Sequence, residues 1–222
     1  MDYPRYWLAS NSPRRREMIS WADWQVKAIS PHIDESLYLD ESPEVYVRRI
    51  AVQKCLKPID GVMNGDTIIA ADTIVVSAEK ILGKPSGPDE AFEMLTELRD
   101  KTHWVITALA VRKARNGQPL MDICRSKVKM RAYSESEIRA YVNSGDPFDK
   151  AGAYAIQDAI FRPAEKFGGC FTSVMGLPLC HLERTLRQYG GYQPTDWGAV
   201  CQKQLKYTCP ITARVMAGED IG

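Results

Sequence analysis

The residues of this chain best suited to chemistry begin with a short polar run that contains two hydroxyls, Ser10 and Ser12, and two guanidinium groups, Arg14 and Arg15. Guanidinium groups donate paired hydrogen bonds that match phosphate oxygens, and hydroxyl groups add single donors. The run therefore predicts a phosphate site. Pro13 and its neighbours would equally suit an ordinary helix start, so the run alone leaves both interpretations open.

Three carboxylates further along the chain add a second kind of chemistry. Asp34, Glu35 and Asp72 are hard oxygen ligands, and such groups hold Mg²⁺ or Mn²⁺ together with a substrate phosphate. A bound divalent ion spreads the charge of the transition state and lowers the pKa of its water. An aspartate that closes a buried strand is also a common turn former, and this alternative holds for Asp34 and Asp72.

Three lysines, Lys54, Lys84 and Lys150, supply further positive charge. A triphosphate carries about four negative charges, so several cations must converge on it where water is excluded. Each lysine taken singly could instead be a solvated surface charge. The set as a whole favours a nucleotide as the ligand.

Two strands must position these side chains. Residues 6–9 predict a short buried strand ahead of the polar run, and residues 14–21 predict a helix whose positive end faces it. Residues 67–71 are small or branched and apolar, which is typical of a strand buried on both faces. We expect this strand to deliver Asp72 and Thr73 at its C-terminal end, where open α/β sheets usually bind ligands.

The remaining patterns complete an α/β domain. Caps and apolar stripes predict helices at residues 42–54, 88–99, 134–143 and 176–190. Alternation predicts strands at residues 24–29, 103–113 and 124–133. The last two strands are expected to form a hairpin through a turn at Asn116 and Gly117. Residues 149–157 read as a polar loop, and residues 191–222 have no assigned structure.

Composition limits the class of protein. The 222 residues are 45% apolar and 26% charged, which suits one sizeable domain or two small lobes sharing a cleft. The net charge of +1 argues against electrostatic binding of a nucleic-acid polymer. The sequence lacks an apolar run of about 18 residues and a leader-like apolar segment. We therefore expect a cytoplasmic protein with no membrane partner.

The cysteines lack the paired spacing of a zinc site and are expected to be free, mostly buried thiols. They are Cys55, Cys124, Cys170, Cys180, Cys201 and Cys209. Cys201 and Cys209 lie close together in the tail, so they are the first pair to test for a disulfide.

Seven short motifs occur in the order found in the Maf family of nucleoside triphosphate pyrophosphatases, which this chain resembles from about residue 5 to about residue 190. The motifs are Ser10-x-Ser12-Pro13-Arg14-Arg15, Ile33-Asp34-Glu35-Ser36, Tyr46-Val47-x-Arg49-x-Ala51-x-x-Lys54, Ala71-Asp72-Thr73, Gly83-Lys84-Pro85, Asp149-Lys150-Ala151-Gly152-x-Tyr154-x-Ile156-Gln157 and Gly176-Leu177-Pro178. The resemblance implies an elongated mixed α/β fold related to the inosine triphosphate pyrophosphatases, with two lobes around a central cleft. It also implies a pyrophosphatase domain at residues 1–190, followed by an extension of unknown role at residues 191–222.

The reaction implied by the resemblance cleaves a nucleoside triphosphate between its α- and β-phosphates, giving a monophosphate and pyrophosphate. Asp72 would be the general base that orients the attacking water, and Glu35 would share the Mg²⁺ or Mn²⁺ with it. The phosphate and other substrate contacts would come from Arg15, Lys54, Lys84, Ser10, Ser12 and Lys150.

Base preference within the family varies with three positions, which here are Arg14, Thr73 and Gln157, as in the branch that acts on dTTP and UTP. The amide of Gln157 could pair with the O4/N3 edge of a pyrimidine, because an amide both donates and accepts. Two departures affect the base pocket: Asp158 stands where the family usually has Gly, and residues 161–170 match loosely.

Two alternatives belong to other functional classes. The family is also associated with regulation of septum formation and cell division, so the chain could bind nucleotide with only incidental hydrolysis. An ordinary phosphomonoesterase would instead release orthophosphate first. The resemblance further suggests a homodimer, for which Tyr192, Trp197 and Tyr207 are candidate contacts, unless the tail packs on its own domain.

Overall fold

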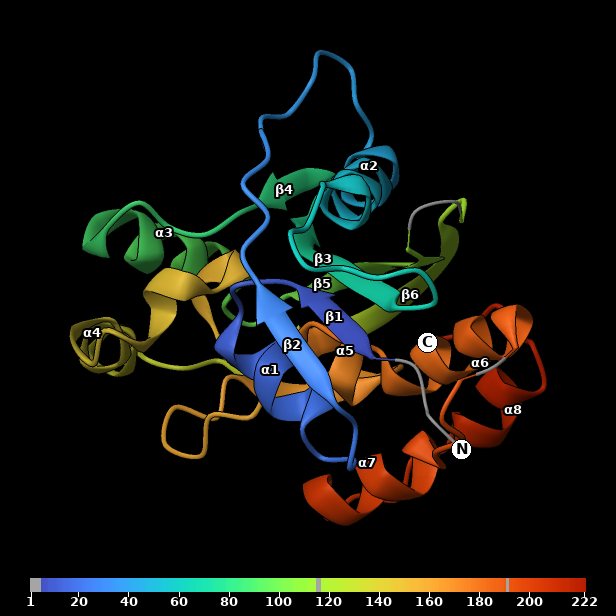
Figure 1. The fold of residues 1–222 in the computed structure, drawn as a ribbon. Coiled ribbons are helices and arrows are strands. Elements are labelled where there is room, and N and C mark those ends of the chain that lie inside the picture. Colours follow the sequence, from blue (N-terminus) through green and yellow to red (C-terminus); the bar gives the residue numbers. More distant parts are fainter. Residues whose placement is uncertain (1–4, 115–116, 191) are drawn as a thin grey trace.

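A computed structural model describes residues 5–114, 117–190 and 192–222. Within this part of the chain, seven strands form one mixed sheet in the order β2-β1-β3-β5-β6-β7, and β4 pairs with β3. The strands are β1 (Tyr6–Ala9), β2 (Val26–Ile29), β3 (Thr67–Ser77), β4 (Lys80–Leu82), β5 (Thr102–Lys113), β6 (Leu120–Met130) and β7 (Ala164–Gly168). The α-helices are α1 (Pro13–Ile19), α2 (Pro43–Leu56), α3 (Pro88–Leu98), α4 (Glu135–Asn143), α5 (Phe171–Met175), α6 (Leu179–Tyr189), α7 (Trp197–Leu205) and α8 (Thr212–Met216). The expected mixed α/β fold is confirmed (Figure 1).

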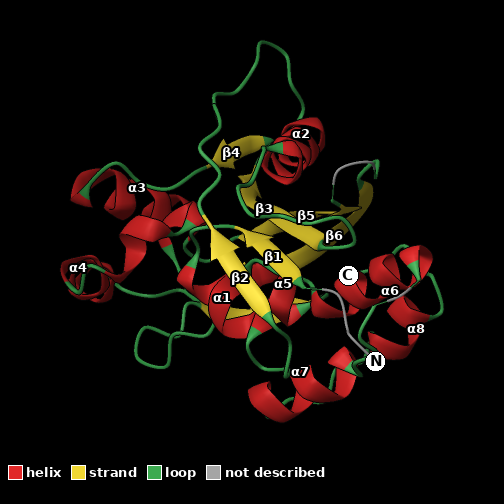
Figure 2. Ribbon diagram, viewed as in Figure 1, coloured by secondary structure: helices red, strands yellow, loops and turns green. Residues whose placement is uncertain are grey.

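The sheet changes from parallel to antiparallel pairing at β3. β1 pairs in parallel with both β2 and β3, whereas β3, β5, β6 and β7 follow one another antiparallel. β5 and β6 form the expected hairpin, with Val111 opposite Leu120. Asn116 of the expected turn lies outside the described residues. Figure 2 shows the strands as the centre of the molecule, with helices packed around them.

Alternation along β3 divides the core between the two faces of the sheet. Ile68, Ala70 and Ile74 pack with α2, whereas Ile69 and Ala71 face the cluster that contains Leu182 and Trp197. Successive strand residues point to opposite faces, so Asp72 lies on the α2 face and Thr73 on the other. On the same face as Thr73, a separate cluster under α3 and α4 begins at Val75.

The starts of α1 and α4 have physical causes that are visible in the sequence, whereas Ser42, the expected cap of α2, makes no side-chain capping hydrogen bond. Ser12 caps α1, where its side chain accepts a hydrogen bond from the Arg15 backbone N–H, and Pro13 occupies the first turn. Ser134 and Glu137 form a complete capping box at α4. The apolar stripe of α3 is buried, as expected. These local signals fix the helices that flank the sheet.

Two expectations about the segments around the candidate residues were wrong. β3 does not end at Ala71 but continues to Ser77, because β5 pairs with it along residues 67–76. Asp72 and Thr73 therefore lie in the middle of a long strand rather than at its end. The expected polar loop at residues 149–157 contains the end of one short 3₁₀ helix (Asp146–Asp149) and the whole of another (Ala151–Ala153).

The extension after residue 190 packs on the sheet domain. α7 and α8 both contact α6, and Trp197 is 0% exposed within the core. Trp197 is therefore a core residue and not a candidate dimer contact. Cys201 and Cys209 are free thiols, so the disulfide considered for them does not form. None of the described helices has the length and apolar character needed to cross a membrane.

Candidate active site

The candidate site lies beside a gap in the edge of β3. On this edge β1 pairs with residues 67–69 and β4 pairs with residues 75–77. Within the described chain, residues 70–74 have no strand beside them on this edge. Side chains from both faces of β3 can therefore reach one space, although strand alternation sends Asp72 and Thr73 in opposite directions.

A cavity of about 480 Å³ occupies this gap. Its size falls in the range typical of small-molecule sites, which is about 300–1,000 Å³. Ten of the eleven residues expected in the site line it: Ser12, Arg14, Arg15, Glu35, Lys54, Asp72, Thr73, Lys84, Lys150 and Gln157. Ser10 is the exception, because it is buried behind the loop. Its hydroxyl oxygen accepts a hydrogen bond from the Ser12 backbone N–H.

Lys54 joins the two expected metal-binding carboxylates. Its Nζ lies 2.8 Å from Asp72 Oδ1 and 2.9 Å from Glu35 Oε1. Asp72 is only 7% exposed, whereas the Glu35 side chain is about half exposed in the loop before α2. Asp34, the third carboxylate of the set, accepts a hydrogen bond from the Ser36 backbone N–H at 2.9 Å and does not line the cavity. The turn-forming interpretation therefore describes Asp34.

Burial raises the pKa of Asp72 above its usual value, and the charges of Lys54 and Arg15 oppose this effect. Desolvation disfavours a charged carboxylate, so the group is more basic than a solvated aspartate. A buried carboxylate of raised basicity at the wall of a cavity is the kind of group that can accept a proton from water.

Arg15 is held by three hydrogen bonds from its guanidinium group. Nε donates to the Gly176 carbonyl at 2.7 Å, one terminal nitrogen donates to Thr73 Oγ1 at 3.0 Å, and the other donates to Ser10 Oγ at 3.4 Å. A guanidinium has five N–H donors, so two remain for a ligand. Burial lowers the pKa of Arg15, against the opposing charge of Asp72. The side chain is thus a fixed cation at the cavity wall.

Gly176 allows the close approach that Arg15 needs. Its φ is +113°, and a Cβ atom at this position would lie 3.2 Å from Arg15 Nε. The left-handed backbone ends α5 and aims the Gly176 carbonyl at the guanidinium. The Gly176-Leu177-Pro178 motif therefore acts in the site through the backbone.

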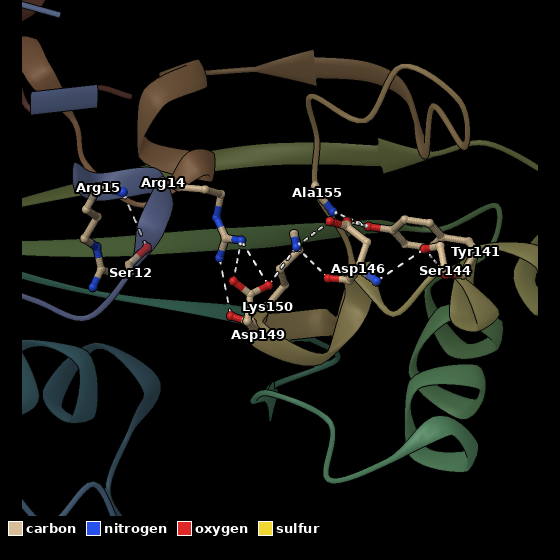
Figure 3. Close-up of polar contacts among 9 residues, drawn as sticks. All are labelled: Ser12, Arg14, Arg15, Tyr141, Ser144, Asp146, Asp149, Lys150 and Ala155. Carbon is tan, nitrogen blue, oxygen red and sulfur yellow. Dashed lines mark hydrogen bonds and ion pairs between the residues drawn. The ribbon is translucent and has the colours of Figure 1, made fainter. Parts of the chain in front are cut away.

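Arg14 and Lys150 are tied to one another through Asp149 (Figure 3). The Arg14 guanidinium lies 3.2 Å from the Asp149 carboxylate, and Lys150 Nζ lies 2.7 Å from the same group. Lys150 also pairs with Asp146 at 2.9 Å, and the hydroxyl of Tyr141 donates to that carboxylate. Partial burial would raise the pKa of Asp149, but Lys150 and Arg14 lower it overall. The cluster fixes the segment that bears Gln157 against α1.

Lys84 and Gln157 are exposed members of the site, as is Glu35. Neither makes an ion pair or side-chain hydrogen bond with any other described residue, so both are available to a ligand. Gly152 holds their two segments together, because its N–H donates to the Gly83 carbonyl at 3.0 Å. Its φ is +68°, and a Cβ there would lie 2.9 Å from Val75, so only glycine fits.

Two further residues shape the site, although neither was among the expected site residues and only Tyr46 belongs to one of the motifs. The hydroxyl of Tyr46 donates to the Glu35 carbonyl at 2.9 Å, and burial, with the charges of Asp72 and Glu35, raises its pKa to about 12. Tyr46 precedes Lys54 by eight residues on α2, a spacing that places both on one helix face and could have indicated it. Thr107 lies opposite Thr73 in the β3–β5 pair, a position that depends on strand register.

The carboxylates fit a metal ion by their chemistry. Oxygens of Glu35 and Asp72 already converge on the single positive charge of Lys54, so the two groups can address one cation. Both are hard oxygen donors, the type preferred by Mg²⁺ and Mn²⁺.

Comparison with known proteins agrees with the geometry. The family described as Maf-like protein matches residues 5–189. The dTTP/UTP pyrophosphatase of Dehalococcoides mccartyi (strain CBDB1) is 43% identical over 189 residues, which cover 84% of this chain and 83% of the relative. The dTTP/UTP pyrophosphatase of Dictyoglomus thermophilum is 39% identical over 184 residues, which cover 82% of this chain and 95% of the relative. The dTTP/UTP pyrophosphatase of Hydrogenovibrio crunogenus is 35% identical over 189 residues, which cover 85% of this chain and 97% of the relative.

The matched region contains every residue of the candidate site, from Ser10 to Gly176, and most of the sheet that positions them. By the extent of this match and by the identity to its relatives, the chain belongs to the Maf family.

Proposed function

We propose that this chain hydrolyses nucleoside triphosphates, with dTTP and UTP as preferred substrates, to a nucleoside monophosphate and pyrophosphate. The observation that carries the proposal is the buried Asp72 carboxylate in a cavity that Arg15, Lys54 and Lys84 also line. The relatives are dTTP/UTP pyrophosphatases, which supports both the reaction and the substrates.

Asp72 acts in this proposal as the general base. Its basicity, raised by burial, suits removal of a proton from the attacking water, and Lys54 keeps the carboxylate oriented at 2.8 Å. Glu35 and Asp72 would hold Mg²⁺ or Mn²⁺, and when bound the ion spreads phosphate charge and lowers the pKa of coordinated water.

The loop before α1 and the lysines of the cavity wall bind the phosphates. The two unpaired N–H donors of Arg15 face phosphate oxygens, with Ser12 and the start of α1 beside them. Lys84 extends a mobile point charge to the distal phosphates from the turn after β4. These contacts stabilise the charge that develops on pyrophosphate as the bond breaks.

Of the residues expected to select the base, some contact it directly and others position a neighbouring side chain. Gln157 lies exposed at the cavity wall, so its amide contacts the pyrimidine edge. Arg14 lies on the same side, paired with Asp149. The Thr73 hydroxyl accepts a hydrogen bond from Arg15. The Thr107 hydroxyl donates its proton to the Ser173 carbonyl, so in the Thr73–Thr107 hydrogen bond Thr73 must be the donor. Thr73 therefore serves as a positioning residue for Arg15 and not as a direct base contact.

The proposal is tested by supplying the purified protein and Mg²⁺ or Mn²⁺ with dTTP, UTP, CTP, 5-methyl-UTP, pseudo-UTP and 7-methyl-GTP. Pyrophosphate and orthophosphate are measured separately. We expect pyrophosphate as the first product, fastest from the uracil and thymine nucleotides. Orthophosphate as the first product would indicate a phosphomonoesterase. Nucleotide binding without turnover would favour the regulatory alternative.

A homodimer remains a proposal that rests on the resemblance, and a cytoplasmic location remains a proposal that rests on the apolar pattern of the sequence. With Trp197 buried, Tyr192 and Tyr207 are the partly exposed aromatic residues of the tail that could contact a second copy. Sedimentation velocity of the full chain over a range of concentrations tests the dimer, and a single monomer boundary throughout would contradict it.

A further inference from the structure

A second cluster of reactive side chains lies outside the cavity, where the extension returns to the sheet. Cys124 comes from β6, Cys170 precedes α5, and His181 lies on α6. All three are buried, and one ligand atom from each lies within 4.8 Å of the other two. Cys170 and His181 lie 46 and 57 positions after Cys124 in the sequence, yet all three side chains meet in the fold. The spacing of the cysteines therefore gave no sign of this cluster.

His181 has a defined tautomer and an unused lone pair. One ring nitrogen, Nε2, lies 3.0 Å from the Ile221 carbonyl, which can only accept a hydrogen bond, so Nε2 carries the proton. Nδ1 is then unprotonated, and it has no hydrogen-bond partner although His181 is 0% exposed. Buried polar atoms are almost always satisfied, so this orphaned acceptor requires an explanation.

The arrangement has the second layer that metal-binding histidines usually possess. A ligating imidazole almost always donates its other N–H to a carbonyl or carboxylate, which fixes the ring and its tautomer. The Ile221 carbonyl fills that role here. Ile211 and Val215 pack in the same cluster as Cys124 and Cys170, and Cys180 adds a third thiol. Two hydroxyls also lie beside the thiols, since Thr172 Oγ1 is 3.3 Å from Cys170 Sγ and Ser126 Oγ is 4.0 Å from Cys124 Sγ.

We infer that Cys124, Cys170 and His181 form a binding site for a thiophilic d¹⁰ cation, Zn²⁺ or Cu⁺. Thiolate and imidazole ligands select these ions over Mg²⁺ and Mn²⁺, which prefer oxygen. Tetrahedral ligands at a Zn–S distance of about 2.3 Å lie about 3.8 Å apart, so the three atoms need to approach one another by no more than about 1 Å. The site is separate from the proposed hydrolytic centre, since none of its ligands lines that cavity.

The ion would fasten the carboxyl-terminal segment to the sheet. The Gly222 carbonyl accepts a hydrogen bond from the Arg125 backbone N–H, next to Cys124 on β6. A Cβ at Gly222 would lie 3.1 Å from His181 Cε1 and 3.3 Å from Cys124 Sγ, so this residue covers the cluster closely. Metal at the cluster would therefore join β6, α5, α6 and the last residues of the chain.

The first test uses the unaltered full-length protein, purified without chelator and analysed for metal by mass spectrometry. We expect about one zinc or copper ion per chain. Replacement by Co²⁺ should give a thiolate-to-cobalt charge-transfer band and intense tetrahedral visible bands, which oxygen ligands at the hydrolytic centre do not produce. Reconstitution with Zn²⁺ and Cu⁺ in separate arms distinguishes the two ions. A Co²⁺ spectrum without the charge-transfer band would overturn the inference.

The second test compares matched variants by metal content and the same spectrum. His181→Gln keeps an N–H for Ile221 but removes the free ring nitrogen, and Cys124→Ser removes one thiolate. Both should lose the bound ion. Cys55→Ser is the control, because Cys55 is an equally buried thiol on α2 that packs in a different core cluster. Undiminished metal binding in His181→Gln and Cys124→Ser would exclude the site.

Discussion

Replacing Asp72 by Asn removes the proposed base while leaving the shape of the site almost unchanged. The amide has the volume of the carboxylate and can still accept a hydrogen bond from Lys54, whose ammonium keeps Glu35 as its charged partner at 2.9 Å. Loss of one member of a buried ion pair is usually costly, by about 3–5 kcal/mol. The remaining Glu35 contact leads us to expect a smaller loss of folding stability here.

The expected loss of turnover is large. A positioned general base contributes about 10²- to 10⁴-fold, equivalent to about 3–5 kcal/mol in the activation free energy. Substrate binding rests mainly on Arg15, Lys84 and the loop before α1, so the KM for dTTP should change much less than kcat.

The assay is pyrophosphate release at saturating dTTP, with the free energy of unfolding measured on the same samples. Asp66→Asn is the matched control, because Asp66 is also a buried, ion-paired aspartate next to β3, but it contacts Arg5 and does not line the cavity. This control should lose stability and keep its kcat. If Asp72→Asn retained a kcat within about threefold of the unaltered protein, Asp72 could not be the base.

Three further changes test the surrounding structure. Burial lowers the pKa of His103 to about 4 from its ordinary value, so the unfolded state takes up a proton first as the pH falls. Stability should therefore be complete above about pH 6.5 and fall by about 2 kcal/mol between pH 7.5 and pH 5, a loss that denaturant unfolding of His103→Gln should not show. Thr107→Val removes the acceptor that orders Thr73 and should lower kcat/KM for dTTP about 3- to 10-fold, whereas Thr107→Ser should restore it. Lys84→Met should raise the KM about 10-fold or more without changing the melting temperature, because the exposed Lys84 has no partner among the described residues.

The sequence was most informative where local signals decide the structure. Caps, apolar stripes and the polar run predicted α1, α3, α4 and the side chains that line the cavity. The length of β3 was not predictable, because its continuation past Asp72 depends on pairing with β5 and not on its own residues.

Contacts between distant segments were equally hidden. The bond from Arg15 to the Gly176 carbonyl joins residues 161 positions apart, and the cluster of Cys124, Cys170 and His181 assembles only when β6 and α6 come together. The sequence left the packing of the tail open between its own domain and a second copy, since an aromatic residue such as Trp197 suits a core and a surface contact equally well.

The cavity wall has a consequence for how strongly salt should affect the reaction. Five cations and three carboxylates line it, which leaves a net charge of +2: Arg14, Arg15, Lys54, Lys84 and Lys150 against Glu35, Asp72 and Asp149. A triphosphate of about four negative charges together with one divalent ion carries about −2. The net charge of the cavity wall therefore balances that of the metal–nucleotide complex. A metal-free triphosphate would leave about two negative charges unbalanced in a partly enclosed space. Added salt should raise the KM for the complex, and free triphosphate should be a weak competitor rather than a substrate.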